Sequence, residues 1–283
     1  MEEHKSSATS LGVARLRAAH QVIDGEPKLL RDEVIVRLMG PDFADHIRDH
    51  PDAYRDPGSK GLRSHVLLRS RYAEDCLAEA YDRGVRQYVL LGAGLDTYAW
   101  RQSPDMPDLR IFEADHPATQ RHKQELLLQA GLTTPDNVRF VPLDLESSTP
   151  AEALTLDGYF DPAAPTFISW LGVMVYLTRP AIDRVFDWLL SLPAGSEMVF
   201  TFTQKRPFDG LGARAAALGE PWQTFFTPEE LEDTLRRRGF TSIHFLQPWE
   251  SWQRYFSSWQ RYFSGKTDGL PAPIRTSIAR IKK

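Results

Sequence analysis

Two glycines and an acid, placed directly after an apolar run, are the residues of this 283-residue chain whose types and spacing most suggest chemistry. The run 87–91 leads into Gly92 and Gly94, which are separated by one residue, and then into Asp96. Glycine has no Cβ and tolerates a positive φ, so such a turn lets a ligand approach the backbone closely. A strand that feeds a glycine-rich turn is typical of the first strand of an open α/β sheet that binds a nucleotide-like cofactor.

A second acid narrows the choice of cofactor. Asp115 ends the expected strand 109–115 and follows Gly94 by about 20 residues, the spacing at which a carboxylate holds ribose hydroxyls in dinucleotide folds. Thr97 stands where the dinucleotide fingerprint has a third glycine, and no Gly-Lys-Ser/Thr sequence follows to hold phosphates. A cofactor with a ribose but no pyrophosphate therefore fits better, and S-adenosyl-L-methionine is our candidate.

An arginine on an apolar helix face has two interpretations. Segment 63–83 has the periodicity of a long helix, and Arg69 shares one side of it with apolar residues such as Val66 and Ala73. Its stem could pack on the surface with its charge in water. Alternatively, its guanidinium could bind a carboxylate above the glycine turn, because arginine recognises carboxylates bidentately.

With S-adenosyl-L-methionine as the cofactor, the first reaction to consider is transfer of its methyl group, in which the attacking oxygen would need little help from the protein. A sulfonium leaves readily, so alignment and desolvation of the attacking oxygen are the main requirements. A carboxylate acceptor is already ionised, whereas a phenol or alcohol needs a general base. His116 is the nearest candidate base, although it could instead cap the helix that follows; Tyr176, Gln204 and Glu220 are further polar candidates near the acceptor. We expect no metal, because no ligand cluster with useful spacing is present.

Alternating strands and helices set the fold that must position these residues. Expected strands are 87–91, 109–115, 137–142, 166–171 and 197–203, and expected helices are 11–20, 28–38, 63–83, 117–130, 180–190 and 227–238. This order predicts a Rossmann-like α/β fold with a mostly parallel, doubly wound sheet and ligands at its carboxyl ends. We divide it into an N-terminal helical cap (1–84), a cofactor-binding core (85–205), and a lid connector, helix and last strands (206–283). Segments 48–63 and 206–219 read as a loop and a mobile connector.

Several motifs in order resemble the leucine carboxyl methyltransferase-like family, and most closely its bacterial polyketide-type O-methyltransferase branch. They are LLGAGLDT at 90–97, FEADHP at 112–117, VPLDL at 141–145, SWLGV at 169–173, GEPW at 219–222, and YFSG with TDG at 262–269. The resemblance covers about residues 8–270. It implies a Rossmann-like class I methyltransferase with a mostly parallel, doubly wound sheet of seven strands. Such an enzyme would use S-adenosyl-L-methionine on a carboxylate or hydroxyl of a small molecule, as in secondary metabolism.

The resemblance also assigns roles. Arg69 would hold the methionyl carboxylate above Gly92, Asp115 the ribose hydroxyls, and Asp144 with Leu145 the adenine. The remaining expected cofactor contacts are Ala93, Gly94, Asp96, His116, Trp170 and Leu171. Leu171 stands where the protein-carboxyl branch has a cofactor-binding glutamate, which leaves the cofactor's ammonium group to backbone carbonyls or water. We expect acceptor contacts from Tyr176, Gln204, Trp222 and Tyr262, and catalytic candidates in His116, Tyr176 and Glu220.

The C-terminal third leaves two questions open. Trp222 could belong to the core or to an aromatic wall for the acceptor. The sequence SWQRYFS at 251–257 is repeated at once at 258–264, either as a tolerated duplication or as a lengthened aromatic lid. Two other functions remain. Because Leu171 departs from the family pattern, the same cofactor could serve another reaction, such as its own cyclisation; the chain could also be a binding module that keeps the cofactor site without catalysis.

Composition limits the partners. The net charge of −4 without a basic stripe argues against nucleic acid, and the single Cys76 excludes an internal disulfide. No apolar run approaches the roughly 20 residues of a membrane span. We therefore expect a cytoplasmic monomer or homodimer that acts on a small molecule without membrane attachment.

Overall fold

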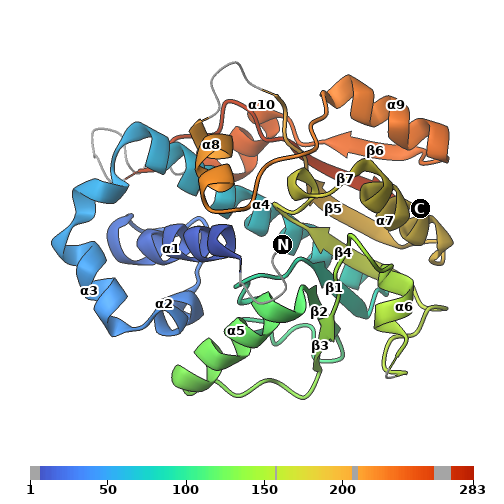
Figure 1. The fold of residues 1–283 in the computed structure, drawn as a ribbon, viewed down its shortest axis with the longest axis horizontal. Helices are drawn as coiled ribbons and strands as arrows, with labels where there is room; N and C mark the ends of the chain where they lie inside the picture. Colours follow the sequence, from blue (N-terminus) through green and yellow to red (C-terminus); the bar gives the residue numbers. More distant parts are fainter. Residues whose placement is uncertain (1–6, 157, 206–209, 258–268) are drawn as a thin grey trace.

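The computed structural model describes residues 7–156, 158–205, 210–257 and 269–283, which fold around one sheet of seven strands (Figure 1). In spatial order the strands are β3 (Val138–Pro142), β2 (Arg110–Asp115), β1 (Gln87–Leu91), β4 (Thr166–Trp170), β5 (Glu197–Thr201), β7 (Ile278–Lys282) and β6 (Ser242–Phe245). Strands β1 to β5 pair in parallel, and β7 is antiparallel to both of its neighbours. The predicted fold class is confirmed.

Helices cover both faces of this sheet and add a bundle at one side. They are α1 (Ala8–Ile23), α2 (Glu33–Met39), α3 (Pro41–Asp49), α4 (Pro57–Asp82), α5 (Pro117–Gln129), α6 (Pro150–Leu154), α7 (Arg179–Ser191), α8 (Gly210–Ala217), α9 (Pro228–Arg238) and α10 (Pro248–Ser251). Shorter turns are η1 (Pro51–Tyr54), η2 (Tyr98–Trp100), η3 (Met174–Tyr176) and the π-helical η4 (Trp252–Phe256). None of the described helices is long and apolar enough to cross a bilayer.

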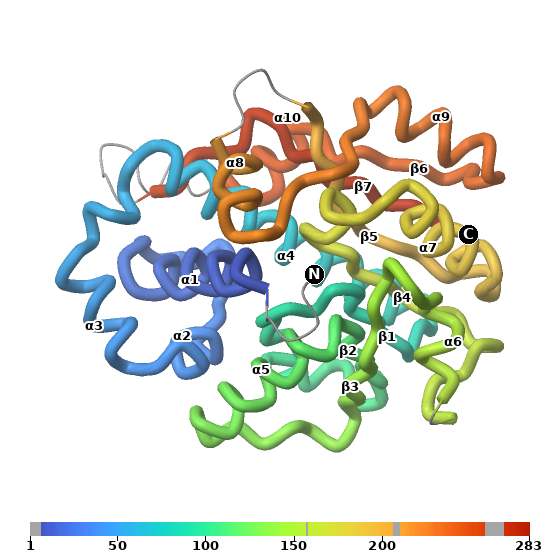
Figure 2. Tube along the Cα trace, viewed as in Figure 1, coloured from blue at the N-terminus to red at the C-terminus, as the bar shows by residue number. Residues whose placement is uncertain are grey.

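Alternation along the central strands divides the core into two layers. Val89 and Leu91 of β1 pack with α6, α7 and α9, whereas Tyr88 and Leu90 pack with α4 on the opposite face. Successive side chains of a strand point to opposite faces, so an entirely apolar strand can be buried on both sides. A third cluster joins α1, α2, α3 and α5, which lie together beside the sheet in Figure 2.

Two segments expected to be irregular are helical. The segment 48–63 contains the end of α3, the turn η1 and the start of α4. Asp56 caps α4 by accepting hydrogen bonds from the N–H groups of Gly58 and Ser59, with Pro57 at the first helical position, so the Pro-Gly sequence starts a helix rather than a loop. The connector 206–219 contains α8, since alanines there favour a helix. By contrast, the capping box of Thr227 and Glu230 is confirmed at the start of α9.

A buried carboxylate fastens α1 to α4. Asp24 follows the last turn of α1, and its two oxygens accept hydrogen bonds from Nε and Nη2 of Arg63, each at 2.7 Å. Arg63 has no exposed surface and also donates to the carbonyl of Tyr54, while His20 Nδ1 lies 2.8 Å from the same carboxylate. Burial alone would raise the pKa of Asp24, but these partners hold the pKa below its usual range. The position of α1 against α4 therefore depends on this pair.

We expect Asp24→Asn to lower the free energy of unfolding by about 3–5 kcal/mol, because it leaves the buried Arg63 without a counter-charge. Urea denaturation followed by circular dichroism would measure this. Glu232→Gln is the matched control, since Glu232 forms an exposed pair with Arg236 whose loss should cost under about 1 kcal/mol. Equal losses for the two variants would show that the buried pair does not fasten α1.

Candidate functional site

A cavity of about 2330 Å³ lies at the carboxyl ends of the parallel strands. It is lined by the turn after β1 and by residues that follow β2, β3 and β4. The strand order reverses between β1 and β4, and ligands of open α/β sheets bind at such a switch point. A single small ligand occupies a pocket of roughly 300–1,000 Å³, so the cavity has room for a cofactor and an acceptor together.

The turn after β1 needs its two glycines. Gly92 and Gly94 have φ of +67° and +50°, values that side chains with a Cβ rarely adopt. A Cβ on Gly92 would lie 2.2 Å from Cγ2 of Val173, so the neighbouring loop also leaves no space for one. The N–H of Gly92 donates to the carbonyl of Ala114 at 2.8 Å, which holds the turn against the end of β2. The result is bare backbone facing the cavity.

Asp115 lies beside this turn, as its sequence spacing predicted. Leu91 pairs with Ala114 in the sheet, so the residues that follow both strands meet at one edge. The Asp115 carboxylate accepts hydrogen bonds from the N–H of Gly94 and from its neighbour His116 at 2.6 Å. Burial raises the pKa of Asp115, although these two N–H groups act in the opposite direction. A carboxylate has about four acceptor positions, so two remain for a ligand diol.

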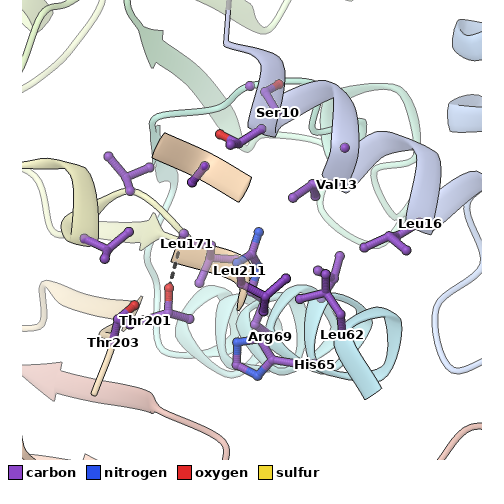
Figure 3. Close-up of a pocket in the computed structure, with 18 of the residues that line it drawn as sticks. Ser10, Val13, Leu16, Leu62, His65, Arg69, Leu171, Thr201, Thr203 and Leu211 are labelled. Atoms are coloured by element: carbon purple, nitrogen blue, oxygen red, sulfur yellow. Dashed lines mark hydrogen bonds between the residues drawn. The ribbon is translucent and has the colours of Figure 1, made fainter. Parts of the chain in front are cut away.

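Arg69 projects from α4 into the cavity, next to Leu171 and one helical turn from His65 (Figure 3). Its guanidinium makes no hydrogen bond or ion pair with any residue of the described ranges. Burial, with a smaller contribution from the charge of Arg17, lowers the pKa of Arg69 to about 10, so it is a cation at neutral pH. A Cβ on Gly172 would lie 2.6 Å from its Nη1, so the glycine makes space for the guanidinium. This arrangement favours the second interpretation of Arg69, an anion clamp.

Asp96 faces the same cavity but is already engaged. Its carboxylate pairs with Arg17 of α1 at 2.8 Å and accepts from the N–H of Tyr98 at 2.7 Å. Burial would raise its pKa, but the charges of Arg17, Arg101 and Lys123 hold the pKa of Asp96 well below its usual range. The Arg17 side chain is only 3 % exposed. From the sequence it was not identified as part of the site; its place on an otherwise apolar helix face was the signal that could have identified it.

The remaining cofactor candidates divide into two groups. Ala93, His116, Asp144, Leu145 and Leu171 line the cavity. Trp170 does not: its side chain is fully buried among Phe186 and Phe200, on the face of β4 covered by α7, so it is corrected from a cofactor contact to a core residue. Next to Leu171, the N–H of Gly172 donates to Thr201 Oγ1 at 2.7 Å, which ties the end of β4 to β5 (Figure 3).

The acceptor candidates are only partly brought together. Tyr176, Gln204 and Trp222 line the cavity, and Tyr262 lies outside the described residues. His116 caps α5, its Nδ1 accepting from the N–H of Ala118 at 3.3 Å, which was the structural alternative for this residue. Its role as a base stays a prediction.

Glu220 also has a structural partner. Its carboxylate accepts hydrogen bonds from Ala8 N at 2.6 Å, from Ser7 Oγ at 3.1 Å and from Thr9 Oγ1, all in or before the first turn of α1. Sequence spacing could not have found this contact, because more than 200 residues separate the partners. A catalytic role for Glu220 stays a prediction.

Known proteins resemble this chain in sequence and in fold. The model of the family described as leucine carboxyl methyltransferase matches residues 10–190. YktD of Bacillus subtilis (strain 168), described by inference as an S-adenosyl-L-methionine-dependent methyltransferase, is 31 % identical over 288 residues, which cover 91 % of this chain and 93 % of that protein. A protein of Mycobacterium avium (strain 104) with the same description is 36 % identical over 203 residues, covering 68 % of this chain and 62 % of its own.

Two solved structures agree in fold at low sequence identity. A duf574 family protein from Streptomyces avermitilis MA-4680 aligns with a TM-score of 0.57 and 16 % identity over 99 % of both chains. A Thermobifida fusca YX protein, described by inference as a methyltransferase, aligns with a TM-score of 0.55 and 20 % identity over 100 % of this chain and 96 % of its own. The family match over more than half of the chain decides the assignment: the protein belongs to the leucine carboxyl methyltransferase family, whose members use S-adenosyl-L-methionine.

Proposed function

We propose that this enzyme methylates an oxygen of a small, secondary-metabolite-like molecule, and that a carboxylate is the preferred acceptor over a hydroxyl. The observation that carries the proposal is the charge distribution of the cavity. At the cofactor end, Asp115 keeps acceptor positions and Arg69 has no partner among the described residues, whereas Asp56 and Glu220 at the other end already have hydrogen-bond partners.

The cofactor end fits S-adenosyl-L-methionine, which supplies a methyl group on a sulfonium. The glycine turn offers bare backbone, and Asp115 keeps two acceptor positions for the ribose hydroxyls. Arg69 offers an unpaired cation, among the described residues, for the methionyl carboxylate. Asp144 and Leu145 follow β3, beside Asp115, where the adenine would lie.

The other end of the cavity suits an apolar body. It is lined by residues from the start of α4, from α8 and the segment that follows it, from η4 and from the segment 269–277; among them are Leu62, Leu211, Trp222, Trp252, Phe256 and Leu270. Pockets for small organic molecules are mostly apolar with a few placed polar groups. This apolar lining therefore suits a small organic acceptor.

A carboxylate acceptor is favoured because this end has no available carboxylate base among the described lining residues. Asp56 caps α4, and Glu220 is bonded to the first turn of α1. Lys60, Arg214 and Arg275 line the same region and bring positive charge. These cations would attract an organic acid, which is ionised at neutral pH and needs no deprotonation.

The proposal predicts a methyl ester as the product. The protein would be incubated with methyl-labelled S-adenosyl-L-methionine and matched pairs of aromatic and aliphatic carboxylic acids and phenols. We expect label in products that mild alkali hydrolyses, since esters are labile where ethers are stable. Alkali-stable label would show that a hydroxyl is the acceptor; methylthioadenosine alone would show cyclisation-type chemistry, and binding without turnover would show a silent module.

Asp115→Ala should raise the Kd for S-adenosyl-L-homocysteine by about 100-fold or more, because each hydrogen bond to a charged group contributes roughly 1.5–3 kcal/mol. Isothermal calorimetry would measure the Kd. Asp105→Ala, at an exposed aspartate outside the cavity, is the control. An unchanged Kd with an intact fold would refute the assignment of Asp115 to the ribose.

Arg69→Met should raise the KM for S-adenosyl-L-methionine by about 10- to 150-fold, for the same reason, and raise the KM for the acceptor far less. Steady-state kinetics with each substrate varied in turn would separate the two. Arg71→Met is the matched control, because Arg71 lies on the same helix but is exposed and pairs with Asp75. If the acceptor KM rises more, Arg69 binds the acceptor instead.

A further inference from the structure

The first turn of α1 lies over the glycine turn and is held from two sides. Ser7 N donates to Thr119 Oγ1 of α5 at 3.3 Å, and the Glu220 carboxylate receives hydrogen bonds from Ser7, Ala8 and Thr9. Glu220 follows α8, so these hydrogen bonds place the segment after α8 beside the start of α1, as it is drawn in Figure 1. The turn thus bridges α5 and the segment after α8, across the cavity.

Ser10 in this turn has a hydroxyl without a partner. Its Oγ is buried and forms no hydrogen bond with any residue in the described part of the chain. Ser10 lines the cavity, on the side of α1 that also presents Val13 and Leu16 (Figure 3). The hydroxyl lies 2.9 Å from the position of a Cβ on Gly94, directly over the backbone whose N–H binds Asp115.

An unpaired buried hydroxyl is unfavourable, since it has lost its water without a replacement. The other buried polar side chains of α1 have charged partners: Arg17 pairs with Asp32 and Asp96 through its Nη atoms, although its Nε has no partner among the described residues, and His20 pairs with Asp24. Ser10 is different because its only side-chain polar group has no partner in the described part of the chain, while the residue lines the cavity in which a ligand with polar groups would lie.

We propose that the first turn of α1 is a clamp on the cofactor. In this clamp, Ser10 donates a hydrogen bond to, or accepts one from, a polar group on the ribose side of S-adenosyl-L-methionine. Glu220 keeps the clamp closed. The inference rests on the proposed use of this cofactor. Glu220 is then a positioning residue that acts through α1 without touching the ligand. Opening of the Glu220 contacts limits entry and departure of the cofactor.

The clamp predicts opposite effects of Ser10→Ala on stability and on binding. The ligand-free variant should keep or raise its melting temperature, because it removes a buried hydroxyl that has no partner. Its Kd for S-adenosyl-L-homocysteine, from calorimetry, should rise about 3- to 10-fold, as expected for loss of one ordinary hydrogen bond. Ser242→Ala, at an exposed serine on the edge strand β6, is the matched control and should change neither.

Glu220→Ala should speed dissociation of S-adenosyl-L-homocysteine in stopped-flow displacement. The dissociation rate of Glu220→Gln should lie between those of Glu220→Ala and the wild type, because an amide oxygen can still accept from Ala8 N. Hydrogen exchange should show the amides of residues 8–10 protected by the ligand in the wild type and not in Glu220→Ala. Glu229→Ala, at an exposed glutamate of α9, is the control.

The outcomes separate this inference from the proposed function. If the wild type binds the ligand but Ser10→Ala leaves the Kd unchanged, or Glu220→Ala leaves dissociation and exchange unchanged, the clamp is refuted and the cofactor assignment stands. If the wild type does not bind S-adenosyl-L-homocysteine at all, both are refuted.

Discussion

A buried cluster of charges beneath the glycine turn is the interaction on which the site depends. Arg17 of α1 pairs with Asp32 at 2.7 Å and with Asp96 at 2.8 Å, and Thr97 Oγ1 donates to Asp32 at 2.7 Å. Arg101 extends the cluster to Glu74 of α4 at 2.7 Å. Buried charges are stable only when their partners are in place, so the cluster forms only when α1, the start of α2, α4 and the turn come together. The N-terminal helices are therefore part of the cofactor site, not an addition to the sheet.

The same cluster decides which charges a ligand can use. Asp96 stands closest to the glycines in sequence, yet its carboxylate is neutralised by Arg17, whereas Asp115 beside the same turn keeps acceptor capacity for a ligand. Arg69 faces the cavity without a carboxylate partner among the described residues, whereas Arg17 and Arg101 are both paired. Free groups of opposite sign thus remain at separate places, an arrangement that suits a ligand carrying a diol at one position and a carboxylate at another.

Local sequence signals predicted the sheet and those parts of the site that follow directly from strand ends. The roles of the other site residues depend on tertiary contacts and could not be predicted from these signals. The glycine turn and Asp115 were found because strand ends and their spacing are local properties. Trp170 was misplaced, since adjacent residues of a strand point to opposite faces and only packing shows which face is covered. Ser10 and Glu220 were beyond reach in their observed roles, because their environment is set by elements far apart in the chain. The helix α8 was missed because its glycines suggested a loop, although its alanines favour a helix.

The backbone after β1 gives a physical reason why a dinucleotide does not fit. Dinucleotide folds place the pyrophosphate at the N-terminus of the helix that follows the glycine turn, where free N–H groups and the helix dipole attract negative charge. Here residues 92–109, all of them described, contain only the single turn η2, and α4, which precedes β1, packs on that face of the sheet instead. Thr97, which replaces the third glycine, uses its hydroxyl to bridge Asp32 and Arg101. The turn therefore lets a ligand approach the backbone closely but offers no helix N-terminus for phosphates. It suits a cofactor that has a ribose and no pyrophosphate.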